Sequence, residues 1–332
     1  MPTAPARIEI CPFPGGKRIA VTTSFDDGVV EDRRVVEAFN QWGLKGTFNL
    51  NSARLRRDGK RPAIEQGGNI DASEVAGLYA GHEVAIHTAT HPHLPLLDAS
   101  QIAAEVLDDR KALEDLVGYP VRGMAYPYGS FNAKVIDLLR ALGIAYCRTT
   151  ARSMPCFPPA EPLAWGTTMH MFDASPEPLP QRWESFHGNP RNSGLFFVWG
   201  HAYEFARPRD RWDELDRIFR PLSGKADVWY ATNIQLFDYE AARRNMVIAA
   251  NRRWACNPSA LTVTLNVDGT LVDVPAGQTV EIRSRIANLK SEISDWQSQI
   301  NPASVTVERP LPSPGRIPRR CGSAPPARLP AP

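Results

Sequence analysis

The feature that most constrains the fold is a regular alternation of short β-rich apolar runs with segments of helical periodicity, which continues to about residue 250. After the first apolar run, for example, Val35, Val36 and Phe39 fall on one helical face. Strands are expected in seven such runs: Arg18–Phe25, Lys45–Leu50, Glu83–His87, Gly123–Tyr126, Ile144–Thr149, Leu195–Trp199 and Val228–Thr232. This alternation predicts an α/β fold with parallel strands.

The helices expected between these strands have recognisable ends. Ser100 can cap a helix that stops at Gly118, and Asn132 can cap a second helix that stops at Gly143. Further helices are expected around 72–79, 209–222 and 235–251, and the Pro-rich stretch from 150 to about 191 is expected to be irregular.

A distorted (β/α) barrel of about seven strands, closed or nearly closed, is the simplest arrangement of these elements. An open doubly wound sheet would satisfy the same pattern. No glycine-rich phosphate fingerprint follows the first strand, which removes the usual reason to prefer the open sheet.

The period changes from about Asn257 onward. Thr262–Val267 and Leu271–Val274 alternate and flank Asp268-Gly269, a hairpin turn signal, and Thr279–Ile282 could add a third strand. We therefore predict three parts: a barrel over 1–252, a small β-rich appendage over 253–309, and a disordered Pro/Arg-rich tail over 310–332. The appendage could bind glycan, mediate oligomerisation or cover a barrel edge.

Composition argues against several classes of function. The 332 residues carry 38 basic and 36 acidic side chains, a net charge of +2, which gives no footprint for nucleic acid. Five cysteines without CxxC spacing argue against a disulfide framework and a cysteine-based zinc site. No apolar run could span a membrane, and no secretion leader is visible. We expect a cytoplasmic protein, although an exported form is also compatible, and the oligomeric state is left open.

Polar residues that could bind a metal or take part in catalysis lie at the ends of four predicted strands. Asp26 and Asp27 lie at the end of the first strand, and His87 and His91 at the end of the third. Tyr128 follows the fourth strand, and His201 follows the Leu195–Trp199 strand. Barrel active sites form where strands end, so these residues should meet at one rim. Two imidazoles at i and i+4 project to the same side of a helical turn. With one carboxylate they would form the ligand set of a catalytic zinc. The alternative is a pair of solvated surface turns.

Together these segments resemble the polysaccharide deacetylase family, also known as the NodB-homology or carbohydrate esterase 4 group. Ser24–Gly28 matches the first motif, Thr/Ser-Phe-Asp-Asp-Gly, and His87–His91 matches the second, His-Ser/Thr-x-x-His. Gly46–Phe48 and Gly81–Val84 are also similar to family sequence. The resemblance covers about residues 18–251 and implies a distorted, often seven-stranded barrel.

The resemblance implies a role for each matched residue. Asp27, His87 and His91 would bind a divalent metal, with Zn²⁺ the expected ion. Asp26 would be the general base and His201 the general acid, and the backbone N–H of Tyr128 would stabilise the oxyanion. The implied reaction removes N-acetyl or O-acetyl groups from an acetylated glycan or amino sugar.

Some positions depart from the family pattern. Ala125 stands where the family carries an arginine that steadies the base, and Arg122 should face elsewhere. The Asp-rich fourth motif has no clear match, and His170 is expected to line the site in its place. Glu204 either orients His201 or caps the following turn.

Two rival functions remain open at this point. Relatives with the same fold open cyclic imides or ureides without a metal, but those relatives tend to lose the ligand residues. The second rival is a non-catalytic, carbohydrate-binding barrel, which the missing arginine favours. Rim aromatics could stack on sugars or belong to the core: Tyr126, Tyr128, Trp165, Trp199 and Tyr203.

Overall fold

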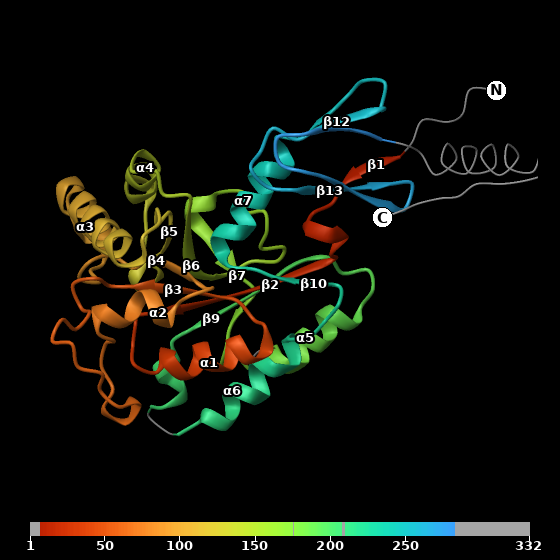
Figure 1. The fold of residues 1–332 in the computed structure, drawn as a ribbon. Helices are drawn as coiled ribbons and strands as arrows, with labels where there is room; N and C mark the ends of the chain where they lie inside the picture. The colour runs from red at the N-terminus through yellow and green to blue at the C-terminus, as the bar shows by residue number, and fades with distance from the viewer. Residues whose placement is uncertain (1–6, 175, 208–209, 283–332) are drawn as a thin grey trace, which may run out of the picture. The chain divides into compact units, whose positions relative to one another are not determined.

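A computed structural model of the protein describes residues 7–174, 176–207 and 210–282 (Figure 1). Its main sheet holds nine strands among the described residues, in the order β7-β6-β5-β4-β3-β2-β9-β8, with β10 beside β2. The strands are β2 (Ile19–Asp26), β3 (Gly46–Leu50), β4 (Glu83–Ile86), β5 (Gly123–Ala125), β6 (Tyr146–Arg152), β7 (Trp165–Thr167), β8 (Met169–His170), β9 (Gly194–Gly200) and β10 (Val228–Tyr230). All their pairings are parallel, as predicted.

The sheet closes into a barrel through its two terminal strands. β7 pairs with β6 and β8 pairs with β9, and only Thr168 separates β7 from β8 along the chain. The backbone N–H of Thr168 itself donates to Phe197 in β9. The predicted α/β barrel is therefore confirmed, and the open sheet is not observed.

The prediction of an irregular stretch from 150 to 191 was wrong. It holds the closing strands β7 and β8 and a helix, α5 (Leu179–Gly188). The two strands are three and two residues long, too short to show a period of two. The helix begins at Leu179-Pro180, and proline is tolerated only in the first turn of a helix.

Helices lie outside the strands (Figure 1). Besides α5 they are α1 (Asp32–Trp42), α2 (Val75–Leu78), α3 (Ala99–Val117), α4 (Ala133–Ala141), α6 (Trp212–Phe219) and α7 (Asn233–Arg244). The N-cap of α3 is Asp98, not Ser100: its carboxylate accepts from Gln101 N–H at 2.9 Å. α7 ends earlier than predicted, and β11 (Val247–Ile248) follows it.

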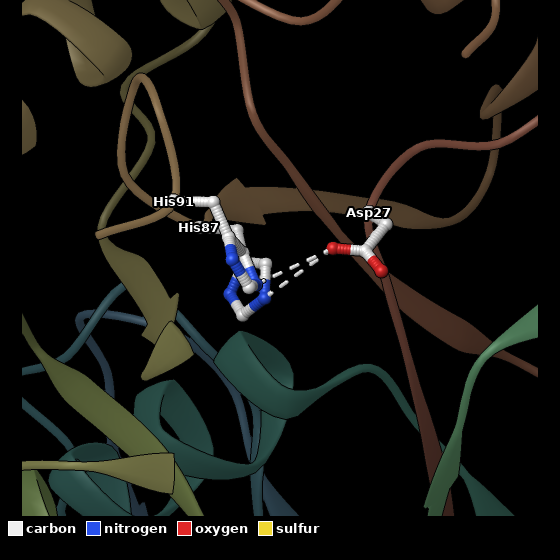
Figure 2. A group of neighbouring side chains, drawn as sticks. All are labelled: Asp27, His87 and His91. Carbon is white, nitrogen blue, oxygen red and sulfur yellow. Dashed lines mark ion pairs between the residues drawn. The ribbon is translucent and has the colours of Figure 1, made fainter. Parts of the chain in front are cut away.

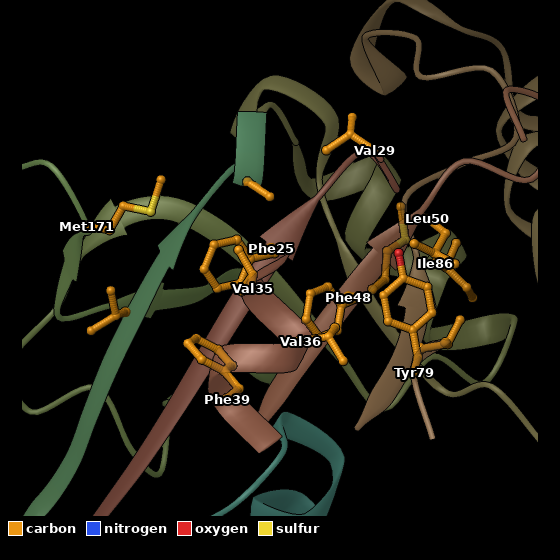
Figure 3. Packing of buried hydrophobic residues seen from close by; sticks show 14 of the residues in the cluster. Phe25, Val29, Val35, Val36, Phe39, Phe48, Leu50, Tyr79, Ile86 and Met171 are labelled. Atoms are coloured by element: carbon orange, nitrogen blue, oxygen red, sulfur yellow. The ribbon is translucent and has the colours of Figure 1, made fainter. Parts of the chain in front are cut away.

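Helix α1 shows how sequence pattern becomes core. It buries Val35, Val36 and Phe39 against β2 and β3, where Phe25 stacks on Phe48 with ring centroids 5.8 Å apart (Figure 3). The helix ends at Gly43, whose φ of 70° is the left-handed conformation that glycine adopts without a Cβ clash. Apolar burial of this kind is the main stabilising term for the barrel.

A second group of strands is antiparallel. β13 (Val263–Val267) and β14 (Thr270–Val274) form the predicted hairpin, with positive φ at Asp268 and Gly269. β13 also pairs with β1 (Ile8–Ile10), while β12 (Trp254–Cys256) pairs with β11 and β15 (Thr279–Glu281). The predicted division at residue 252 stays a prediction. The tail over 310–332 and the appendage beyond residue 282 lie outside the described residues. Every helix in the described part is too short or too polar to cross a membrane.

The close approach of β5 and β6 gives a stability prediction. Gly123 is the register partner of Tyr146, and a Cβ at Gly123 would overlap the Tyr146 phenol, which donates to the buried Glu83. Gly123→Ala should lower the free energy of unfolding by about 1–3 kcal/mol, the usual effect of overpacking. The control is Gly77→Ala on the exposed face of α2, where an added Cβ would contact no other atom. This change should raise the free energy of unfolding by about 0.5–1 kcal/mol. Urea unfolding of both variants measures the difference. Equal stability of Gly123→Ala and wild type would contradict the packing described.

Candidate active site

The predicted site residues meet at the carboxyl end of the barrel strands. Asp26 is the last residue of β2 and Asp27 follows it, while His87 follows β4 directly. The carboxylate of Asp27 points toward the imidazoles of His87 and His91 (Figure 2). Its Oδ1 lies 3.8 Å from Nε2 of His87 and 3.5 Å from Nε2 of His91. The three side chains are therefore brought together from two distant stretches of sequence.

Left-handed turns, not a helix, produce this convergence. φ is 82° at Asp27, 65° at Thr88 and 66° at His91. The expected helical turn carrying both histidines was therefore wrong, although both imidazoles face the same point. Positive φ in non-glycine residues is costly, and it occurs mainly at functional sites. Asn69 helps to hold the first turn by donating to the backbone oxygen of Asp27 at 2.7 Å.

Neighbouring groups fix the tautomer and the orientation of the His87 imidazole. Its Nδ1 lies 2.8 Å from the carbonyl oxygen of Ala125, so Nδ1 carries the proton and Nε2 presents a lone pair to Asp27. The buried carboxylate of Asp109 in α3 accepts from the backbone N–H groups of His87 and Ser52, at 3.0 and 2.7 Å. These contacts hold the imidazole in the orientation that a metal ligand requires.

The donor set fits a divalent cation. Oδ1 of Asp27, the atom that faces both imidazoles, is buried without a hydrogen-bond partner, an arrangement that costs free energy unless another group compensates. Ligands of a tetrahedral zinc lie about 3.3 Å apart, close to the separations from Asp27. Burial lowers the pKa of His87 and lowers that of His91 to about 4, which keeps both imidazoles neutral.

Asp26 is buried beside this group. Arg148 Nη2 donates to both of its carboxylate oxygens, and Asn49 Nδ2 donates to Oδ1 at 2.8 Å. Burial alone would raise the pKa of Asp26, but the neighbouring charge and hydrogen bonds of the Arg148 guanidinium lead the effects that outweigh it and lower the pKa to about 2. The carboxylate is therefore ionised. Arg148 and Asn49 were both missed in the sequence.

His201 lies across the site, bound to Glu204. Its Nδ1 donates to Glu204 Oε1 at 2.7 Å, and its Nε2 lies 3.9 Å from Oδ2 of Asp26. The same Oε1 accepts from the backbone N–H of His201 at 3.1 Å, so Glu204 both orients the imidazole and caps the turn. Burial lowers the pKa of His201, but the bond to Glu204 and the charge of Asp26 outweigh it, and the net pKa is raised.

His170 forms a hydrogen-bonded group with Glu204 and His201. Its Nδ1 accepts from Phe172 N–H, so its Nε2 donates to Glu204 Oε1 at 3.0 Å. Although His170, His201 and Glu204 could also surround a cation, their separations are those of hydrogen bonds and are shorter than the about 3.3 Å between zinc ligands. His170 thus contacts the site through Glu204.

The aromatic residues divide between rim and core. Tyr128 is 57% exposed and has a φ of 59°. Its ring stacks on the imidazole of His93, with ring centroids 3.8 Å apart, and also lies beside His91. Trp199 is half-buried over Arg148, and Tyr203 lies partly buried beside His201. Tyr126 and Trp165 are buried and belong to the core. The oxyanion role of the Tyr128 N–H stays a prediction.

Comparison with known proteins finds sequence similarity over the amino-terminal part of the barrel. Residues 14–147 match the family model for polysaccharide deacetylase. The chain is 28% identical over 123 residues to the peptidoglycan-N-acetylglucosamine deacetylase PgdA of Listeria monocytogenes, covering 36% of this chain and 23% of PgdA. It is also 28% identical over 123 residues to a chitin deacetylase of Pestalotiopsis sp, covering 36% of this chain and 38% of that enzyme. The match thus spans less than two-fifths of each relative.

A solved structure extends the likeness of the fold. A presumed polysaccharide deacetylase from Mycobacterium smegmatis superimposes with a TM-score of 0.50 at 19% identity, over 74% of this chain and 96% of that one. The shared fold covers most of the barrel, and the family match covers its first motifs, Ser24–Gly28 and His87–His91. Residues 14–147, less than half of the chain, are therefore similar to the polysaccharide deacetylase family.

Proposed function

We propose that the protein is a metal-dependent hydrolase that removes N-acetyl (or O-acetyl) groups from a carbohydrate. The observation that carries the proposal is the placement of an ionised carboxylate, Asp26, between a candidate metal group and a candidate acid. Its Oδ2 lies 3.9 Å from Nε2 of His87 on one side and 3.9 Å from Nε2 of His201 on the other. Peptidoglycan and chitin deacetylases among its relatives support the substrate class.

Asp27, His87 and His91 would hold the cation, and two imidazoles with one carboxylate suit Zn²⁺. When bound there, a divalent cation polarises the acetyl carbonyl and lowers the pKa of a water molecule to about 7. Asp26 accepts a proton from the attacking water. The backbone N–H of Tyr128 stabilises the oxyanion, a contribution worth about 3 kcal/mol per donor in other enzymes.

His201 supplies the second proton transfer. Because its Nδ1–H is bound to Glu204, the proton for the leaving nitrogen comes from Nε2, which faces Asp26. The C–N bond breaks, and acetate and a free amine result. The raised pKa of His201 keeps more of it protonated at neutral pH, as a general acid requires.

The experiment that tests this function measures acetate released from N-acetylated chito-oligosaccharides, peptidoglycan fragments and an O-acetylated xylan, with and without a chelator. We expect release from at least one N-acetylated substrate and its loss on chelation. Hydrolysis of a cyclic imide by chelated protein would favour the metal-free rival, and binding of glycan without acetate release would favour the binding barrel. The cytoplasmic location stays a prediction.

Glu204 gives a prediction for the pH profile. Glu204→Gln keeps an oxygen for the His201 imidazole but removes the negative charge that favours the imidazolium, so the pKa of His201 should fall. The general acid then loses its proton at lower pH. We expect the basic limb of kcat/KM to move down by about one pH unit, which lowers activity about tenfold on that limb. Glu37→Gln, on the exposed face of α1, is the control. A basic limb at its wild-type position would show that Glu204 does not tune the acid.

A further inference from the structure

We infer that Arg148 is the positioning residue for the base Asp26, and that it takes over from the arginine absent at position 125. The inference rests on the proposed function. Arg148 lies on β6, where it is the direct register partner of Ala125 on β5. Register partners in a parallel sheet direct their side chains to the same face, so an arginine on either strand can reach the same point.

The contacts of Arg148 are concentrated on Asp26. Its side chain is fully buried, and Nη2 donates to both carboxylate oxygens. The Nε and Nη1 atoms are buried without a hydrogen-bond partner, and the guanidinium lies 4.8 Å from the ring centroid of Trp199. A guanidinium buried with a single carboxylate partner is costly, which is unusual for a merely structural ion pair.

The same contacts select one oxygen of Asp26 as the basic atom. Oδ1 accepts from both Arg148 and Asn49. Oδ2 accepts from Arg148 and also lies 3.9 Å from both His87 Nε2 and His201 Nε2. Oδ2 therefore faces the space between the metal group and the acid, and the water that loses its proton lies against Oδ2. Arg148 holds the carboxylate plane in this orientation.

Arg122 differs from Arg148 although it also makes a double contact with an aspartate. It precedes β5, and its two terminal nitrogens donate to the two oxygens of Asp238, at 2.9 and 2.7 Å. This pair is partly exposed and joins β5 to helix α7, away from the carboxyl ends of the strands. Arg122 thus faces elsewhere, as predicted, and provides a matched control for loss of an Arg–Asp pair.

The test compares Arg148→Lys, Arg122→Lys and the double variant Ala125→Arg/Arg148→Ala, using acetate release and Zn²⁺ binding. Lysine keeps the charge but lacks the rigid planar guanidinium that fixes the direction of the Nη2 donors toward Asp26. We expect Arg148→Lys to lower kcat about 100-fold, the usual effect of misplacing a catalytic group, with KM and Zn²⁺ affinity within about twofold of wild type. The double variant should turn over at least about tenfold faster than the single variant Arg148→Ala, and Arg122→Lys should match wild type.

Three results would overturn the inference. Arg148→Lys could keep the wild-type kcat, or it could lose Zn²⁺ binding in parallel with activity, as a structural residue would. A folded double variant could show no recovery over a folded Arg148→Ala. Absence of acetate release from wild type as well as Arg122→Lys would instead refute the proposed function, and the role of Arg148 with it, so the two failures can be told apart.

Discussion

Replacing Asp26 by asparagine is expected to slow acetate release by about a thousand-fold while leaving cation binding nearly intact, because general base catalysis contributes about 10²–10⁴-fold. Asparagine keeps an oxygen that can accept from Arg148 and Asn49, so the fold around it should persist. It cannot accept a proton from water. The three candidate ligands, Asp27, His87 and His91, are unchanged in this variant.

Steady-state kinetics and a Zn²⁺ titration of Asp26→Asn measure the two halves of this prediction. Thermal unfolding of the variant controls for a loss of folded protein. A variant that keeps the wild-type rate would show that another group takes the proton. A variant that loses both rate and Zn²⁺ would place Asp26 among the ligands instead.

The second large effect is expected from Asp27→Ala. This change removes the only carboxylate in the candidate metal group of the described residues and leaves two neutral imidazoles. Even outer groups around a metal contribute 10–100-fold to affinity, so loss of a ligand should weaken Zn²⁺ binding by more than about 100-fold. Acetate release at a fixed low Zn²⁺ concentration should fall in proportion.

Asp26→Asn is the matched control for Asp27→Ala, since it alters the adjacent carboxylate on the same turn. Asp26→Asn should lose its rate of acetate release and keep its Zn²⁺ affinity, whereas Asp27→Ala should lose both. Wild-type Zn²⁺ affinity in Asp27→Ala would mean that the carboxylate and the imidazoles do not share an ion.

The sequence pattern predicted most of the barrel because apolar, β-rich runs alternate there with helices that are long enough to show their period. Seven strands and the helices α1, α3 and α4 were located from this pattern. The closing strands β7 and β8 were missed because they are short, lie in a Pro-rich region and are separated by one residue instead of a helix. Strand β1, three residues long, was also missed.

The candidate site was predictable where its residues lie in contiguous motifs. Asp26, Asp27, His87 and His91 belong to two short stretches, and the structure brings those stretches together. Arg148 was not predictable, because its relation to Asp26 depends on the register between β5 and β6. Glu204 was noticed as a neighbour of His201, but its bond to His170 joins residues 34 positions apart and only the fold reveals it.

The most direct test of the account titrates metal-free protein with Zn²⁺ while acetate release from an N-acetylated oligosaccharide is followed. One cation held by Asp27, His87 and His91 predicts negligible activity without metal, a linear rise, and a plateau at about one equivalent. Full activity in metal-free protein, with no further change on addition of Zn²⁺, would contradict the account.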